Sequence, residues 1–369
     1  MKLIIILTLT LFSLNITAQE KPCTIIVDVN HTDKLYLSYF AEDVLSVSLE
    51  NPTGNTLLSV SEVILTDRNI FVKSRYIGSP KTTRFLKYNS NGKFIEEIGL
   101  KNSQTKEFLR LHYVLPDYEK QEFLLKYSKY YAILDFDGRL KSRDECKGTN
   151  VILSPIFNKY FWTLSQFIDI EKEIKNIYLI KKDKKGSNTD TLYHATASLN
   201  EVEKGYKRYN APLPSMEMPT QWFTSNDKLF VSMAIEDVIL EVDKYDRVNI
   251  VYKFIHKNIS EESINRITYP DRFILERFIF YGYNIKSIRY YYVYDISKKE
   301  GFNVILRRNS SRKLISGIQD DINNTGFIHL EKGFNSELFF TKNTEELKEQ
   351  NIISPLNSNI SLFLVVPKQ

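Results

Sequence analysis

The sequence of 369 residues is poor in cysteine, glycine and alanine, and it has no block of charge of one sign. With two cysteines the fold cannot depend on a disulfide framework, although a chain of this length can bury a full core without one. The net charge of +5 is spread among interleaved acidic residues, which argues against a nucleic-acid partner. Beyond the first residues no apolar run reaches the ~20 residues of a transmembrane helix.

The N-terminal residues have the three parts of a secretory signal: the positive Lys2, the apolar run 3–14, and the small-residue cleavage site that ends at Ala18. We therefore expect residues 1–18 to be removed and residues 19–369 to form one domain in the periplasm or outside the cell. A lipid anchor on Cys23 is the alternative, but Glu20, Lys21 and Pro22 stand where small and apolar residues are needed.

An exported chain can form disulfides, so Cys23 and Cys146 could make one long-range bridge. Two unpaired buried thiols are the alternative interpretation, and the sequence does not decide between them.

Strand-forming residues are abundant, with 23 tyrosines and 23 phenylalanines. Apolar residues recur with a period of two in short runs, which predicts strands 61–65, 69–75, 83–88 and 93–99 as one antiparallel four-strand unit. Its last turn contains Asn91 and Gly92, which both tolerate positive φ. In the next copy Asp135 to Gly138 stands at the equivalent place.

The four-strand unit recurs along the chain at intervals of roughly 45 to 60 residues, the range of propeller blades. Further copies are expected at residues 121–144, 160–186, 228–255, 273–298 and 326–340. We therefore predict an all-β fold, a six-bladed β-propeller of four-stranded antiparallel blades. A seventh blade would require that one of the longer copies be divided.

Strand 289–294 supports blades over a jelly roll, the main rival fold. Period two places Tyr290, Tyr292 and Tyr294 on one face and Tyr291 and Val293 on the other. Both faces are bulky, as expected for a sheet covered on two sides, whereas a jelly roll would give one polar face.

Two further elements are expected near the chain ends. The β-branched run 24–29 is predicted to complete the last blade, which would close the ring and leave no open edge. A short helix over 345–350 is predicted, capped by Asn343 or Thr344, with Glu346 placed for a capping box on Asn343.

Several segments, in this order, resemble a known family: residues 47–50, 85–88, 92–95, 98–99, 133–138, 237–243 and 320–324. The family is the six-bladed β-propeller proteins secreted by Bacteroidetes, many of them of unknown function. The resemblance implies the propeller fold but no catalytic residue. It departs at residues 102–106, which lack the glycines of the family turn, and the lipid-attachment cysteine of many members is not carried over.

Motifs for catalysis and cofactors are missing: there is no Gly-x-Ser-x-Gly elbow, phosphate loop or dinucleotide fingerprint, and we expect no cofactor. The five histidines, at 31, 112, 194, 256 and 329, are scattered without metal-ligand spacing and are interpreted as surface or core residues. Asp320 and Asp321 are weak candidates for a calcium site, with a polar turn as the default interpretation.

Aromatic residues supply the candidates for ligand binding. Trp162, Trp222 and Phe223 could stack on sugars or peptides if they lined the mouth of the propeller, although core packing between blades is the favoured interpretation. The proline-containing loop 209–219 could form a rim over one face.

The sequence favours a binding or scaffold protein of the cell envelope, whose partner is a protein, peptide or glycan, and we expect a monomer. The rival hypothesis is a hydrolase or lyase with a site in the central channel. It requires that residues such as His112, His256, His329, Asp320 and Asp321 converge there. A structural or signalling subunit with a constant protein partner is a third hypothesis.

Overall fold

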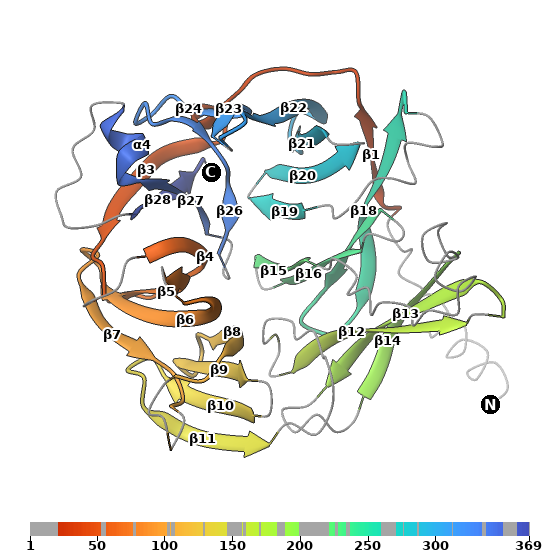
Figure 1. Cartoon of the computed structure of the whole chain (residues 1–369). Coiled ribbons are helices and arrows are strands. Elements are labelled where there is room, and N and C mark those ends of the chain that lie inside the picture. Colours follow the sequence, from red (N-terminus) through yellow and green to blue (C-terminus); the bar gives the residue numbers. More distant parts are fainter. Residues whose placement is uncertain are drawn as a thin grey trace, which may run out of the picture.

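The structure is a computed structural model in which the strands form sheets arranged around a central axis (Figure 1). The described residues are 21–368, except 53–56, 77–78, 102–103, 105–107, 128–129, 146–156, 158–159, 170, 183–188, 199–220, 226–227, 234–236, 260–270, 276, 286–287, 312, 334–336 and 350–359. The expected signal 1–18, Cys146 and the loop 209–219 therefore lie outside the described residues.

Three sheets come from the first half of the chain. The first contains β4 (Leu57–Leu65), β5 (Asn69–Tyr76), β6 (Ser79–Asn89) and β7 (Phe94–Ile98). The second contains β8 (Leu111–Asp117), β9 (Glu122–Tyr127), β10 (Tyr130–Asp135) and β11 (Leu140–Glu145). The third contains β12 (Phe161–Asp169), β13 (Ile174–Lys182) and β14 (Thr189–Ser198). Within each sheet, consecutive strands pair antiparallel.

Two larger sheets follow along the chain. One contains β15 (Gln221–Ser225), β16 (Lys228–Met233), β17 (Val238–Val242) and β18 (Val248–Lys257), with β1 (Cys23–Asp28) added beside β18. The other contains β19 (Asp271–Leu275), β20 (Phe278–Ile285), β21 (Ile288–Asp295), β22 (Glu300–Arg308) and β23 (Leu314–Ser316).

The last two sheets combine both ends of the chain. The small one contains β2 (Leu35–Tyr36), β24 (Ile318–Asp320) and β25 (Gly326–Ile328), and η2 (Leu37–Tyr39) follows β2. The other contains β26 (Glu331–Lys332), β27 (Leu338–Asn343), β28 (Ile360–Pro367) and β3 (Ala41–Leu49).

The described strands therefore form a β-propeller with seven blades, and the expected number of six is wrong. The segment 326–340, expected as one copy, is divided between two sheets. Residues 326–328 form β25 in the small sheet, whereas β26 and β27 begin the four-stranded sheet that follows. The strands of the small sheet have only two or three residues, too few to show a period of two in the sequence.

The prediction that residues 24–29 complete the last blade is also wrong. Residues 23–28 pair in parallel with β18, with Ile26 opposite Ile255. The last four-stranded sheet is completed instead by β3, which pairs antiparallel with β28 and places Leu49 opposite Ile360. Strand β1 buries Ile25 and Val27 in a core cluster that it shares with β20 and β21, so its apolar face has another partner.

The core lies between neighbouring sheets, as the two bulky strand faces predicted. The ring of Phe71 on β5 packs edge-on against Phe123 on β9, with centroids 4.7 Å apart. The next residue, Val72, points to the opposite side and belongs to a cluster with Phe339 on β27. Successive residues of one strand thus belong to two cores, which is the arrangement of blades packed face to face.

Four hairpins between a third and a fourth strand share one kind of hydrogen bond, from turn amides to an Asn or Asp side chain. Asn89, Asp135 and Asp295 each end a third strand, and Asp243 directly follows one. Each of these side chains accepts hydrogen bonds of 2.8–3.2 Å from backbone amides of the turn. This is the turn chemistry in which Asp and Asn replace a backbone acceptor. The sequence-based interpretation of Asp135 as a turn residue is confirmed.

Helix α4 (Thr344–Lys348) confirms the predicted cap. The Asn343 side chain accepts a hydrogen bond of 2.8 Å from the Glu346 amide, and the Glu346 carboxylate accepts one of 3.2 Å from the Asn343 amide. None of the helices in the described part of the chain has the length and apolarity needed to span a bilayer.

Candidate functional site

Two of the three aromatic candidates, Trp162 and Trp222, pack in a core cluster between two sheets. Trp162 on β12 is fully buried, donates a hydrogen bond of 3.3 Å from Nε1 to the Phe157 carbonyl, and packs against residues of β16 and β17. Trp222 on β15 is half-buried against the same cluster. Phe223 follows Trp222 in β15, and its side chain is outside the described part of the structure. Trp162 therefore fills the core, while ligand contacts by the other two residues stay a prediction.

The candidate histidines occupy three different places in the fold. His112 lies on β8, where burial lowers its pKa, and Arg110, Lys126 and Lys73 lower it further. His256 on β18 has Nε2 2.8 Å from the hydroxyl of Tyr281.

His329, between β25 and β26, contacts the ring of Tyr291 with centroids 6.4 Å apart. Burial lowers the pKa of His329 to about 4, with further contributions from Arg289 and Arg308. The described residues show no convergence of the three histidines on one site.

The acidic candidates have structural partners. Asp320 is buried, and its carboxylate accepts hydrogen bonds from the Ile322 and Asn323 amides and from the Thr325 hydroxyl at 2.5 Å. The Asp321 carboxylate accepts hydrogen bonds from the amide and the hydroxyl of Ser38, at 2.9 and 2.5 Å. This pair therefore closes a turn and attaches η2 to it. Among the described residues, no three His, Cys, Asp or Glu side chains are grouped as metal ligands.

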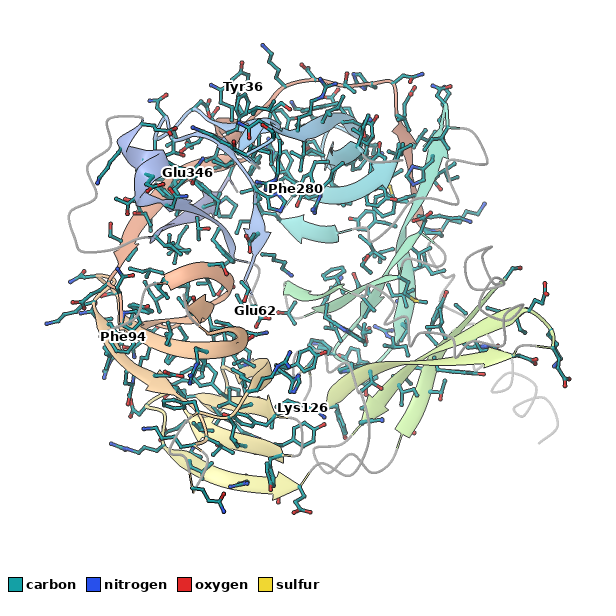
Figure 2. All side chains as sticks on the ribbon, viewed as in Figure 1. Tyr36, Glu62, Phe94, Lys126, Phe280 and Glu346 are labelled. Carbon is teal, nitrogen blue, oxygen red and sulfur yellow. The ribbon has the colours of Figure 1, made fainter. Side chains whose placement is uncertain are left out.

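The inner side of the ring carries an ion pair. Glu62 on β4 lies toward the centre of the ring in Figure 2, and its Oε1 is 2.5 Å from Nζ of Lys73. Burial raises the pKa of Glu62, and the ion pair with Lys73 opposes that rise. The Glu62 carboxylate is thus held in place by Lys73 on the neighbouring strand β5.

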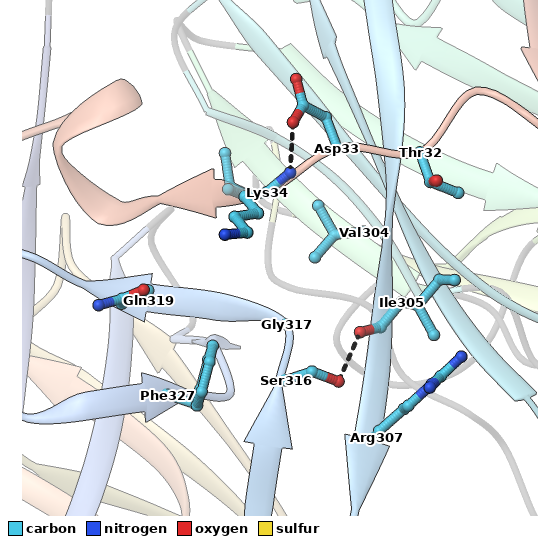
Figure 3. A pocket seen from close by; sticks show the side chains of 11 residues that line it. Thr32, Asp33, Lys34, Val304, Ile305, Arg307, Ser316, Gly317, Gln319 and Phe327 are labelled. Atoms are coloured by element: carbon cyan, nitrogen blue, oxygen red, sulfur yellow. Dashed lines mark hydrogen bonds between the residues drawn. The ribbon is translucent and has the colours of Figure 1, made fainter.

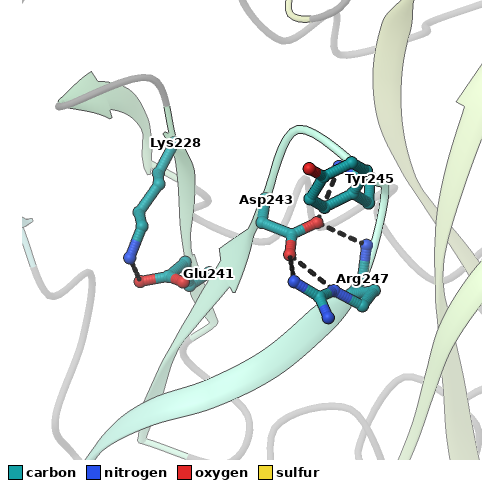
Figure 4. Close-up of polar contacts among 5 residues, drawn as sticks. All are labelled: Lys228, Glu241, Asp243, Tyr245 and Arg247. Carbon is teal, nitrogen blue, oxygen red and sulfur yellow. Dashed lines mark hydrogen bonds and ion pairs between the residues drawn. The ribbon is translucent and has the colours of Figure 1, made fainter.

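Asp243 shows how the acidic residues at the hairpins are used (Figure 4). Its carboxylate accepts hydrogen bonds from the amides of Tyr245 and Arg247 and from Nε of Arg247 at 2.7 Å. Burial opposes ionisation of Asp243, but the hydrogen bonds from Arg247 and Tyr245 outweigh it and lower its pKa. Nearby, Lys228 pairs with Glu241 at 3.0 Å. Asp243 and Arg247 thus stabilise the turn between β17 and β18, whereas Lys228 and Glu241 pair across β16 and β17.

A pocket of about 460 Å³ lies where β22, β23 and the small β2–β24–β25 sheet meet. The segment 32–35, which leads from β1 into β2, forms its third wall (Figure 3). A volume of this size falls in the range of small-molecule sites, ~300 to 1,000 Å³.

The floor of the pocket is apolar and its rim is polar. Leu35 and Val304 are only 1% and 2% exposed, and the half-buried Phe327 also lines the pocket. Two of the exposed rim residues are Lys34 and Gln319, on one side of the opening in Figure 3, and Arg307 extends on the other side. An apolar floor with a few convergent polar groups is the usual composition of a binding site.

Hydrogen bonds from β22 hold the third wall. The Asn303 amide donates to the His31 carbonyl at 2.8 Å, and the Asp33 amide donates to the Asn303 carbonyl at 2.9 Å. On the opposite wall Gly317 has φ +129°, and a Cβ there would lie 2.4 Å from Cδ2 of Leu306. Glycine at this position lets the chain turn from β23 into β24 without filling the space.

The rim carries more positive than negative charge. In the described part of the chain, neither Lys34 nor Arg307 has an ion-pair or hydrogen-bond partner for its side-chain nitrogens. Asp33 is the rim carboxylate, and it accepts a hydrogen bond of 2.7 Å from the Lys34 amide. In Figure 3 its side chain points away from Arg307 and Phe327.

None of these pocket residues is a candidate from the sequence. They come from residues 32–35 and from residues 304–327, near opposite ends of the chain, and no local motif joins them. The one available signal is Gly317 between two strand runs, which marks a sharp change of direction.

Comparisons with known proteins support the fold. No protein-family model and no curated protein matches the chain. A solved structure from Bacteroides fragilis, named "Putative exported protein", has a TM-score of 0.64 and 12% identity over 94% of this chain and 100% of that chain. A member of the DUF4221 family from Bacteroides vulgatus has a TM-score of 0.42 and 10% identity over 92% and 99%. At these identities the first likeness shows the propeller fold alone, and the second adds no argument.

Proposed function

We propose that the protein is an exported, non-catalytic binding protein of the bacterial cell envelope, related to the exported propellers of Bacteroides. The observation that carries this proposal is the pocket between β22, β23 and β24, with its apolar floor and polar rim. Its ligand is a small molecule or a short part of a peptide, glycan or envelope protein, as the volume of about 460 Å³ requires.

A hydrolase or lyase is the weaker candidate. It needs acids or histidines gathered in the channel, but His112 on β8 and His256 on β18 lie in other sheets than Asp320 on β24, which Asp321 follows. The two aspartates and His256 have structural partners. The Glu62 carboxylate at the inner side of the ring is paired with Lys73. No specific observation favours catalysis.

The binding proposal is tested by filling the pocket. Gln319→Trp places a bulky indole at the rim, at an exposed position of β24. Ile315→Trp is the matched control, because Ile315 is 49% exposed on the adjacent β23 and does not line the pocket. A panel of tripeptides and oligosaccharides is screened by thermal shift, since a ligand of the native state raises its stability.

We expect at least one compound to raise the melting temperature of the wild-type protein and of Ile315→Trp, but not of Gln319→Trp. Equal shifts in all three proteins would place binding elsewhere. The absence of any shift from the whole panel would count against the proposal.

Export is tested by mass spectrometry of the protein isolated from its native host. The proposal expects a mature chain that begins at Gln19 and occurs in the periplasmic or extracellular fraction. A chain beginning at a lipid-modified Cys23 would show that the protein is anchored instead.

A further inference from the structure

We infer that the pocket at β22, β23 and β24 binds a carboxylate that is attached to an apolar body, such as an arylalkanoic acid or the C-terminal phenylalanine of a peptide. This inference rests on the proposed function and adds the chemical class of the ligand. It combines two properties of the pocket, the apolar floor and the basic rim.

The floor selects the apolar body. Leu35 and Val304 present buried aliphatic surface, and Phe327 adds a half-buried aromatic face. An aromatic ring placed against Phe327 would remove apolar surface from water on both partners and gain the usual stacking contact. A fully polar sugar would bury this apolar surface without offering an apolar surface in return.

The rim selects the charge. Lys34 and Arg307 stand on opposite sides of the opening, and their side-chain nitrogens have no partners among the described residues. A guanidinium can hold both oxygens of a carboxylate, and a lysine ammonium can approach the same group as a point charge. Asp33 bears the opposing charge. Its carboxylate accepts a hydrogen bond from the Lys34 backbone amide, and its side chain points away from Arg307.

The surroundings of the pocket are also basic. Arg308 follows Arg307 in β22, and the low pKa of His329 has burial as its first cause and Arg289 and Arg308 as the others. His329 stands two residues after Phe327 of the floor. Arg289 and Arg308 have interactions of their own, so the positive charge available to a ligand at the opening is that of Lys34 and Arg307.

The apolar contacts fix where the ligand lies, and the rim charges fix which end faces outward. The ring lies on Phe327, and the carboxylate lies at the opening between Lys34 and Arg307. Because the rim is exposed, each cation adds a modest part of the affinity, and that part decreases as salt is added.

The inference is tested by isothermal titration of the full mature chain with 3-phenylpropionate and with its neutral isostere 3-phenylpropanamide. We expect the acid to bind about tenfold more tightly than the amide, because the free energies of two exposed charge contacts add. Arg307→Gln and Lys34→Gln should each weaken binding of the acid about two- to fivefold and leave that of the amide unchanged. Lys244→Gln, which removes an exposed cation in the turn between β17 and β18, is the control and should change neither.

The two sources of the carboxylate are separated by Ala-Ala-Phe with a free or an amidated C-terminus. Tight binding of the free peptide relative to its amide identifies a peptide terminus as the ligand, whereas binding of 3-phenylpropionate alone identifies a free acid. Either result supports the inference.

Equal affinity for acid and amide, both blocked by Gln319→Trp, would overturn the chemical class and leave the pocket as a binding site. Binding of the acid that survives Arg307→Gln and Lys34→Gln unchanged would overturn it as well. If none of the four probes binds, the inference fails, while ligands of the wider panel still test the proposed function separately.

Discussion

The hydroxyl of Tyr283 on β20 donates a hydrogen bond of 2.6 Å to Oδ1 of Asn303 on β22, and both side chains are buried. The Asn303 amide nitrogen then donates to the carbonyls of Asp28 and His31, at 2.6 and 3.0 Å. A single carboxamide thus connects the β19–β23 sheet to the N-terminal segment that forms one wall of the pocket.

Replacement of Asn303 tests this connection. Asn303→Ala leaves the Tyr283 hydroxyl without its acceptor and removes one hydrogen bond from each of the Asp28 and His31 carbonyls, which keep their backbone donors. We expect the free energy of unfolding to fall by about 3 kcal/mol. Urea denaturation measures the loss. Asn30→Ala is the control, because Asn30 is exposed and should cost less than about 0.5 kcal/mol. Equal losses for the two variants would show that the connection contributes nothing specific.

Two glycines of equivalent hairpins should respond differently to alanine. Gly92 has φ +80°, and a Cβ there would lie 2.1 Å from the carbonyl oxygen of Ser48 on β3. Gly138 has φ +89°, but its nearest atoms would be side-chain carbons of Ile98 at 3.5 Å. We expect Gly138→Ala to cost about 1–2 kcal/mol from backbone strain alone, and Gly92→Ala about 2 kcal/mol more from the clash. Similar midpoints in chemical denaturation would contradict this packing of the first hairpin on β3.

A designed disulfide tests the pairing of β3 with β28. Ser48 lies opposite Ser361, with hydroxyl oxygens 3.4 Å apart. In a background without Cys23 and Cys146, the double variant Ser48→Cys, Ser361→Cys should oxidise readily. Its disulfide should stabilise the chain by about 4 kcal/mol, because it closes a very long loop. The reduced form of the same variant is the control, and failure to oxidise would show that another strand lies beside β28.

The stability of the fold should depend on pH through His329. Its folded pKa of about 4 lies below the ordinary value of 6.5, so the unfolded chain takes up a proton first as the pH falls. The corresponding stability is fully present above pH 6.5 and is lost between pH 6.5 and 4, about 2 kcal/mol of it by pH 5.

His329→Phe keeps a ring beside Tyr291 and removes the titration, so it should lose less stability than the wild type between pH 7 and pH 5. His194→Phe changes an exposed histidine and serves as the control. Parallel pH profiles of the wild type and His329→Phe in urea would rule out this source of acid sensitivity.

The features that sequence analysis identified are those determined by local chemistry. Period two in strand 289–294 predicts two bulky faces, and in β21 both faces are buried, with Tyr292 and Tyr294 on one and Tyr291 and Val293 on the other. The turn at Asp135 and the cap at Asn343 follow from side-chain hydrogen bonds within a few residues. Such features need no knowledge of the rest of the chain.

The features that sequence analysis missed depend on distant partners. Both β1 and β3 are strands near the N-terminus, and their own residues do not reveal that β28 accepts β3 while β18 accepts β1. The small sheet is invisible for a related reason, since its strands are too short for a period. The pocket is built at the junction of these elements, and its residues therefore could not be grouped before the pairing was known.

Hydrogen exchange of backbone amides with and without 3-phenylpropionate tests most directly whether this pocket is a carboxylate-binding site. We predict slower exchange in residues 32–35, 304–307 and 316–319 when the acid is present, and a smaller effect on the same residues with 3-phenylpropanamide at the same concentration. Protection confined to other segments, such as the strands at the inner side of the ring, would contradict it.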